Sequence, residues 1–271
     1  MNTVPFVFCD SVISTLGKFD HLRELVSALS PRYCKTWKAV LEDHISNRRE
    51  TDVWLGCIDL DRLLSLRRIK KKHLRIGRIN WYGKPLSSND FELLNYVKTL
   101  ALYPILYVDN QDRSPTSKEK ESFAESLRSI PLSTIYMFHP YEAVLRQQAP
   151  SKVIKRVVLK GDGWSKEVQP VIEEILLTHP IEYAEIGDSF VFGNDFVEKL
   201  FDVPCLTSKE RSFYIHIDNE SFAELCRFRP NLQIEKTVDK IIWKRDDGVQ
   251  VRMKFNSCSK STLFEFYDGH I

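Results

Sequence analysis

Few residues of this chain have the types and spacing that catalysis requires. Residues 160–164 read KGDGW and place two glycines between an expected strand and an expected helix. Such a turn can cradle a phosphate at a helix N-terminus, although it is more commonly only a turn. The sequence contains none of the glycine-rich nucleotide-binding motifs, and none of the zinc-protease or serine-hydrolase motifs. We therefore expect no catalytic residues.

The histidines do not define a site either. His216 and Asp218 share one face of an expected strand, but no third ligand or nucleophile accompanies them. His44 lies on the apolar stripe of an expected helix, and we interpret it as a packed, hydrogen-bonded histidine. His139 precedes Pro140 at a strand end, where a loop is expected. The sequence predicts no metal ligands and no cofactor.

One segment is strongly charged. Residues 67–78 contain seven lysines and arginines in twelve positions. Such a run can bind phosphates or act as a nuclear targeting signal. Leu66, Ile69, Leu74 and Ile76 interrupt the charged positions, which indicates that part of the run packs. We interpret the run as a solvated connector, and nucleic acid is not an expected partner.

Composition and charge are those of an ordinary globular protein. Of the 271 residues, 43% are hydrophobic and 28% are charged, and the net charge is +2. So small a net charge gives no argument for nucleic acid or an anionic membrane as partner. The six cysteines are scattered without a C-x-x-C pair, which favours a reducing compartment. We expect a cytoplasmic or nuclear protein without a membrane segment.

Three short helices are expected in residues 1–48. Pro5, Asp20 and the pair Ser30-Pro31 are helix start signals. Apolar residues at helical spacing follow them, in the first helix Phe8, Cys9, Val12, Ile13 and Leu16, and in the third Tyr33, Cys34, Trp37, Val40 and Leu41. Because so small a unit has only a thin core, its apolar surface needs cover from elsewhere.

This segment resembles an F-box. Pro5 matches the proline of that motif, and the five apolar residues of the first helix match the positions after it. Cys34-Lys35-Thr36-Trp37 is similar to the Cys-basic-x-Trp of the last F-box helix. The resemblance implies that the segment binds the Skp-family adaptor of a cullin ubiquitin ligase through Pro5, Phe8, Cys9, Val12, Ile13, Leu16 and Trp37. The alternative is that the helices only cap the following domain.

A strand–helix rhythm begins after the basic run. The apolar runs that predict strands are 73–81, 105–110, 132–139, 154–161, 181–188 and 212–218. Amphipathic helices lie between most of them, with capping-box spacings at Asn89–Glu92 and Thr116–Glu119. A strand and a helix repeating at about 27 residues is typical of a leucine-rich-repeat-like array. An ordinary α/β sheet is the alternative.

Strand alternation predicts one polar, aromatic face. Successive side chains of a strand point to opposite faces, so every second residue lies opposite the apolar set. The outward set is Tyr107, Asp109, Tyr136, Tyr183, Glu185, Tyr214 and His216. Tyrosine is favoured at recognition surfaces, so we expect this face to bind the target protein. The alternative is that loops or helices cover it.

The later part of the chain predicts a β-hairpin. Residues 239–256 contain the three-residue loop Asp246-Asp247-Gly248, in which Gly248 takes the left-handed position. This loop predicts that Trp243 lies opposite Val251 and that Ile241 lies opposite Met253. A third strand over 261–267 continues the meander, and the strands together would cap the repeat stack.

The sequence thus predicts an α/β protein in three parts. These are an F-box-like helical module (1–48), a basic helical connector (49–72) and a leucine-rich-repeat-like α/β domain with a C-terminal β-hairpin cap (73–271). The whole chain resembles nematode-type F-box proteins, in which a short F-box precedes a diverged repeat or FTH-type domain. The resemblance implies a non-enzymatic substrate-recognition subunit of a Skp–cullin–F-box ubiquitin ligase. The alternatives are an interaction scaffold and, more distantly, an enzyme that uses the 160–164 turn.

Overall fold

The computed structural model describes most of the chain from residue 35 onward. The described residues are 9–10, 12, 35–100, 103–109, 115–203, 211–217, 224, 227, 230–237, 240–245, 247–256 and 261–267. Residues 9, 10 and 12 are helical, and helix α3 covers Lys35–Asn47. The rest of the expected first helix and the whole second helix lie outside the described residues, as do Pro5, Phe8, Ile13 and Leu16.

The described strands form one eleven-stranded sheet in the order β1-β2-β3-β4-β5-β6-β7-β11-β10-β9-β8. The strands are β1 (Arg49–Leu55), β2 (Leu74–Trp81), β3 (Ile105–Val108), β4 (Thr134–Met137), β5 (Arg156–Leu159), β6 (Tyr183–Ile186), β7 (Arg211–His216), β8 (Gln233–Lys236), β9 (Lys240–Lys244), β10 (Gln250–Asn256) and β11 (Ser261–Tyr267). Each of the six strands expected between residues 73 and 218 is present.

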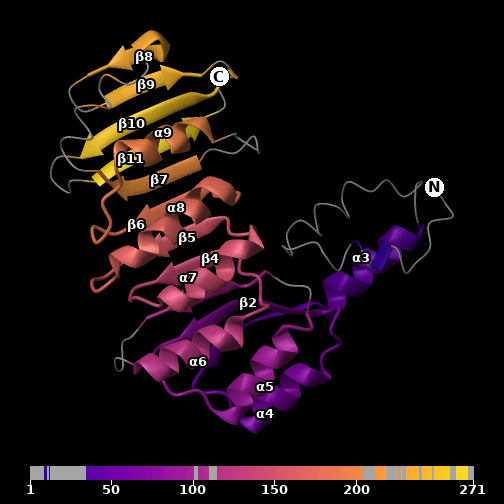
Figure 1. Ribbon diagram of the computed structural model, residues 1–271. Coiled ribbons are helices and arrows are strands. Elements are labelled where there is room, and N and C mark those ends of the chain that lie inside the picture. The colour runs from indigo at the N-terminus through magenta and orange to yellow at the C-terminus, as the bar shows by residue number, and fades with distance from the viewer. Residues whose placement is uncertain are drawn as a thin grey trace.

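Strands β1 to β7 are parallel and follow chain order. An α-helix connects each neighbouring pair, and Figure 1 shows these helices on one face of the sheet. They are α4 (Leu60–Arg68), α5 (Ser88–Val97), α6 (Ser117–Leu127), α7 (Glu142–Gln148), α8 (Gln169–Thr178) and α9 (Asn194–Asp202). Short 3₁₀ turns occupy Ala149–Ser151, Lys166–Val168 and Pro230–Leu232. The expected alternation of strands and helices is confirmed.

The core lies between the sheet and this single helix layer. On each parallel strand every second side chain is buried beneath the helices, as with Leu106 and Val108 on β3 or Ile135 and Met137 on β4. At the centre, the rings of Trp81 and Phe123 lie 3.9 Å apart between centroids. Aromatic pairs of this kind add stabilisation beyond the burial of their area.

Two capping boxes fix the starts of α5 and α6. Thr116 and Glu119 cap α6 as the spacing predicts. The cap of α5 is Ser87 with Asp90, two residues before the predicted Asn89–Glu92 pair, so that prediction is wrong. Asp90 is fully buried, and its carboxylate also accepts a hydrogen bond from the backbone of Gly56 at 2.9 Å. This second bond ties the start of α5 to the end of β1.

Residues 49–72 are not a helical connector throughout. Only Leu60–Arg68 is α-helical, whereas Arg49–Leu55 forms the edge strand β1, which pairs with β2. Val53 and Leu55 of β1 are buried, and Trp54 between them is 47% exposed on the opposite face. The edge strand therefore extends the same alternation and belongs to the sheet.

The hairpin forms in the predicted register. Trp243 lies opposite Val251 and Ile241 opposite Met253, and Gly248 has a positive φ of 87°. The expected third strand, β11, pairs with β10 on one side and with β7 on the other. The antiparallel strands are consequently a continuation of the parallel sheet, joined to it through β11.

Two tryptophans on opposite faces allow a direct test of the core. We expect Trp81→Ala to lower the free energy of unfolding by about 3–5 kcal/mol, because it leaves a cavity beneath the helices. Trp54→Ala is expected to cost about 1 kcal/mol or less, because about half of its side chain is already in solvent. Urea unfolding of both variants measures this difference, and equal losses would contradict the assignment of Trp81 to the core.

Candidate functional site

The face of the sheet opposite the helices carries the expected tyrosines. We call Tyr107, Tyr136, Tyr183 and Tyr214 the tyrosine face. Across β3 to β7 the strand register aligns, in order, Tyr107, Tyr136, Val158, Glu185 and Tyr214. The core cluster of buried hydrophobic residues includes the alternating residues of these strands and none of the four tyrosines. The predicted outward orientation is confirmed.

Ring contacts join the tyrosines into two groups. Tyr107 lies 6.3 Å from Tyr136 and 5.5 Å from Phe138 between centroids. Tyr183 and Tyr214 are 5.6 Å apart. Strand β5 separates the groups and contributes Val158, which is only 4% exposed. The tyrosine face therefore consists of two aromatic groups on either side of β5.

These rings remain accessible. Tyr214 is 37% exposed, and Tyr107, Tyr136 and Tyr183 are half-buried. Tyr82, which the sequence analysis did not single out, joins the face at 6.1 Å from Tyr107. Its position follows from the alternation of β2, because Trp81 next to it is buried under the helices. Aromatic side chains of this kind offer contact area at low cost in conformational entropy.

Glu185 organises the second group. One of its carboxylate oxygens accepts a hydrogen bond from the Tyr183 hydroxyl at 3.0 Å, and the other lies 2.8 Å from Lys160 Nζ. Burial, together with the hydrogen bond to Glu185 and its negative charge, raises the pKa of Tyr183 to about 12. At neutral pH the Tyr183 hydroxyl is protonated and acts here as a hydrogen-bond donor to Glu185.

Asp109 and His216 lie at the ends of their strands. His139 Nε2 is 3.8 Å from Asp109 Oδ1, a loose and partly exposed pair. Burial and the Asp109 charge raise the pKa of Tyr107. His216 is half-buried, and its expected companion Asp218 lies outside the described residues.

The 160–164 turn is explained by packing. Gly161 has a φ of 79°, and a Cβ atom added there would lie 2.2 Å from the carbonyl oxygen of Phe138. The indole nitrogen of Trp164 donates to the carbonyl of Lys160 at 3.0 Å. Glycine is thus required for the close approach of the turn to the end of β4. A phosphate is not needed to account for it.

The described residues hold no group of three or more His, Cys, Asp or Glu side chains placed to bind a metal ion. Within the same residues no helix is long and apolar enough to cross a membrane. What the tyrosine face offers is aromatic area, one phenol donor and paired charges. Aromatic area combined with hydrogen-bonding groups is typical of protein recognition surfaces.

The described part of the N-terminal segment has a small core of its own. Cys9, Val40 and Leu41 are buried, whereas the main core cluster begins at Val53. Val12 and Trp37 are half-buried. Figure 1 shows α3 extending away from the sheet. Cys9, Val40 and Leu41 therefore lie outside the main core cluster of the sheet domain.

A cluster of charged groups joins this segment to the sheet. The ammonium group of Lys72 donates to both Asp10 Oδ1 and Asp43 Oδ2 at 2.9 Å. His44 is fully buried, as the sequence predicts, and its Nε2 lies 3.1 Å from the same Asp10 oxygen. His73 packs against His44 at 5.1 Å between ring centroids. We call these five residues the junction cluster.

Comparisons with known proteins add little. No family model and no curated protein matches the chain. A matching solved structure is the C-terminal domain of a protein assigned as a chitinase from Desulfitobacterium hafniense DCB-2, at 10% sequence identity, covering 82% of this chain and 86% of that one. The TM-score is 0.25, which is too low to establish a shared fold.

The junction cluster predicts acid sensitivity. Burial lowers the pKa of both His44 and His73 below the ordinary value of 6.5. The negative charge of Asp10 beside His44, and of Asp43 beside His73, opposes this lowering. The positive charges of Lys72 and of Arg48 or Lys70 add to it. The folded state therefore takes up these protons less readily than the unfolded state. The neutral histidines therefore stabilise the folded state fully above pH 6.5, and this contribution is lost as the pH falls below that value.

We expect amide hydrogen exchange in α3 to accelerate from about pH 7.5 to about pH 5.5, after correction for the intrinsic rates. His44→Asn keeps a polar group beside Asp10 but cannot titrate, so it should reduce the acceleration. An unchanged pH dependence in this variant would show that His44 does not cause it.

The Glu185 group predicts a late tyrosine titration. Subtracting the ultraviolet titration of Tyr183→Phe from that of the wild type isolates one phenol, which we expect to ionise with a pKa of about 12. Glu185→Gln should bring this value part of the way down towards 10, because the carboxylate charge is gone while the burial remains. A difference signal centred at the ordinary tyrosine value would contradict the hydrogen bond.

Proposed function

We propose that this protein is a substrate-recognition subunit of a Skp–cullin–F-box ubiquitin ligase. In this proposal the tyrosine face binds the target protein, and residues 1–48 form the F-box-like module that binds the Skp-family adaptor. The observation that carries the proposal is the helix-free side of the sheet, whose aromatic rings lie side by side and remain accessible.

Three properties of the tyrosine face support target binding. Its rings are held by a rigid sheet, so little conformational entropy is lost when a partner covers them. Tyr183 and Glu185 add hydrogen-bonding groups within the aromatic area. Tyr214 and Trp54 extend the exposed aromatic surface towards both sides of the parallel strands. The few residues that dominate binding at protein interfaces are enriched in tyrosine, tryptophan and arginine.

Adaptor binding rests on the F-box resemblance and on the position of the N-terminal segment outside the main core cluster. The proposed contact residues Val12 and Trp37 are half-buried and thus only partly covered by the described chain. The main core cluster does not extend to Cys9, Val40 or Leu41. A partner that covers the remaining apolar surface would stabilise so small a unit.

The protein itself performs no covalent step in this proposal. The target is held on the tyrosine face while the ligase modifies it by proximity, so no catalytic residue, metal or cofactor is assigned. The leucine-rich-repeat-like description of residues 73–271 belongs to the same proposal, since a stack of strand–helix units leaves one strand face free for a partner.

A second candidate is a non-enzymatic interaction scaffold whose helical module only caps the α/β domain. The junction cluster favours it, because Lys72 ties Asp10 and Asp43 to the turn before β2. Cys9 is also fully buried without any partner protein. In this candidate the tyrosine face still binds a protein, but no adaptor is recruited.

Co-purification of the full chain with a Skp-family adaptor tests the two candidates. We expect Val12→Asp combined with Trp37→Ala to weaken adaptor binding about tenfold or more, because both changes fall on the proposed contact face. Tyr107→Ala combined with Tyr136→Ala serves as the matched control. It should leave adaptor binding unchanged and reduce the capture of target proteins.

If the wild-type chain does not bind the adaptor, the ligase proposal fails. If target capture nevertheless depends on the tyrosines, the scaffold remains. Adaptor binding that the double variant at Val12 and Trp37 does not weaken would contradict the assignment of these residues to the interface.

A further inference from the structure

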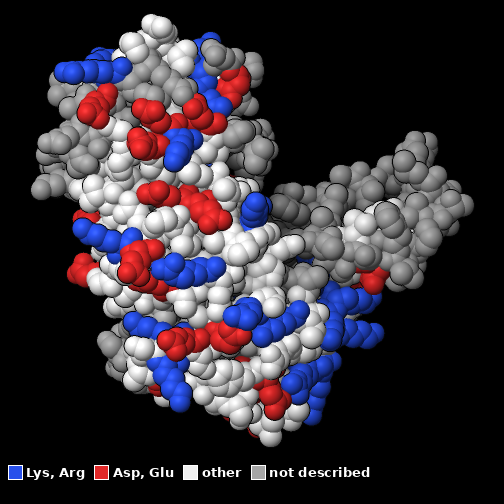
Figure 2. Space-filling model, in the orientation of Figure 1, with Lys and Arg blue, Asp and Glu red and all other residues white. Residues whose placement is uncertain are grey.

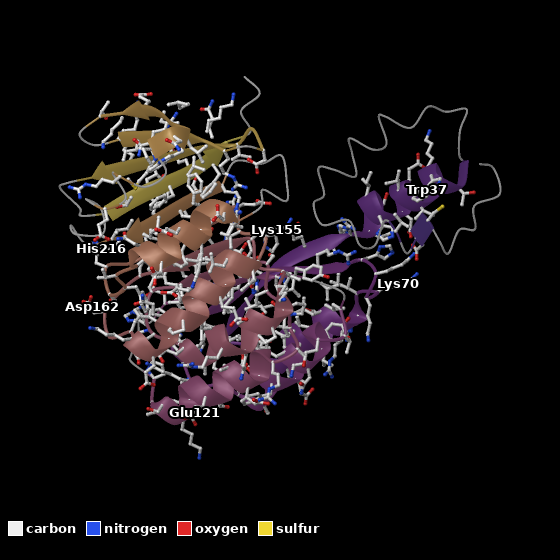
Figure 3. All side chains as sticks on the ribbon, turned by 45° about the horizontal axis from the view of Figure 1, so that its top comes forward. Trp37, Lys70, Glu121, Lys155, Asp162 and His216 are labelled. Carbon is white, nitrogen blue, oxygen red and sulfur yellow. The ribbon has the colours of Figure 1, made fainter. Side chains whose placement is uncertain are left out.

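A group of exposed cations lies at the end of α4, on the helix side of the sheet. We call Arg67, Arg68, Lys70 and Lys71 the basic patch, and all four are exposed. Figure 2 shows lysine and arginine side chains gathered on this side of the molecule, with few carboxylates between them. Lys70, labelled in Figure 3, lies where α3 leaves the sheet. Because the protein has a net charge of only +2, this concentration of positive charge is local.

Few of these charges are neutralised. Arg67 contacts Glu92 of α5 at 3.1 Å, and both side chains are about half exposed, which makes the pair weak and exchangeable. The ammonium of Lys71 lies 5.7 Å from the centre of the Tyr96 ring. Arg68 and Lys70 have no ion-pair partner among the described residues. Lys72, in contrast, is fully engaged in the junction cluster.

Helix stability accounts for only part of the patch. Cations in the last turn of a helix interact favourably with its dipole, which explains Arg67 and Arg68 in the last turn of α4. Lys70 and Lys71 follow the helix, and the structure of α4 does not require their charge. Four neighbouring cations also repel one another, so their proximity has a cost in stability that an anionic ligand would remove.

A groove adjoins the patch. It lies along the exposed surface of α5, has a volume of about 500 Å³ and is lined by Arg67, Glu92, Asn95, Tyr96 and Thr99. The hydroxyl of Tyr96 is a neutral donor at physiological pH, and burial raises its pKa further above the ordinary value. An aromatic ring, an amide and a hydroxyl beside exposed cations match the side chains and backbone of a peptide.

We propose that the basic patch and this groove bind an acidic segment of a partner protein. The carboxylates of such a segment would pair with Arg68 and Lys70 and compete with Glu92 for Arg67. A nucleic acid is less well matched, because its backbone requires a longer stripe of cations and the surrounding surface carries charges of both signs. The proposal does not depend on the tyrosine face, which lies on the opposite side of the sheet.

Fluorescence anisotropy of a short labelled peptide of alternating glutamate and serine tests the proposal on the full chain. We expect binding that weakens as salt rises. Arg68→Glu, Lys70→Glu and Lys71→Glu together should weaken it about tenfold or more. The control changes three exposed lysines on other elements, Lys118→Glu, Lys166→Glu and Lys199→Glu, and should alter affinity less than about twofold. Both triple variants have the same net charge.

Three outcomes would overturn the proposal. The first is an absence of peptide binding to the wild type even at low salt. The second is an equal loss in both triple variants, which would mean that net charge and not the patch attracts the peptide. The third is tighter binding of a DNA duplex with the same number of charges, lost in the patch variant, which would make the patch a nucleic-acid surface. Circular dichroism of each variant confirms that it is folded.

Discussion

The main core of the structure lies on one side of the sheet. A single layer of helices covers one face of the sheet, so each strand must present apolar residues to that layer at every second position. The other face gains no such cover from the described helices and has to be compatible with water. Aromatic residues with a polar group meet this requirement, since their rings pack against one another while their hydroxyls stay hydrated. The constraint that builds the core therefore also builds the tyrosine face.

The same constraint explains how much of the fold was predictable. The positions of β2 to β7 and of β9 to β11, the outward orientation of the tyrosines and the register of β9 with β10 depend on residues close in sequence, and these were found, whereas β8 was not predicted. Strand β1 was missed because only Val53 and Leu55 mark its buried side, next to the charged start of the strand. The cap of α5 was misplaced although Ser87 and Asp90 have capping-box spacing, because Asn89 and Glu92 have the same spacing two residues later. Only the additional bond from Gly56, a residue far away in the chain, has no local signal.

For the candidate sites too, the sequence of residues 67–78 predicts the charges but not where each side chain lies. The sequence reveals seven cations but not their environments, which differ sharply. Lys72 is bound by two carboxylates, and burial lowers the pKa of Arg75 to about 10. Arg78 is exposed beside Ile105 on the sheet face opposite the helices, and the other four form the basic patch. The cations of this one segment thus lie in three places, namely the junction cluster, the basic patch and the sheet face opposite the helices. They separate because the segment passes from a helix through a turn into a strand, and its side chains point in different directions.

Among the described strands, β11 is synthesised last but does not lie at the edge of the sheet. It follows β8, β9 and β10 in the chain, yet it is inserted between β10 and β7. The parallel strands can extend their ladder one after another as they leave the ribosome. The β8–β10 meander has no such route, since its attachment awaits a segment that is made later. During this interval β7 and β10 both present unpaired backbone groups, and the nascent chain passes through a stage in which chaperones would have most to protect.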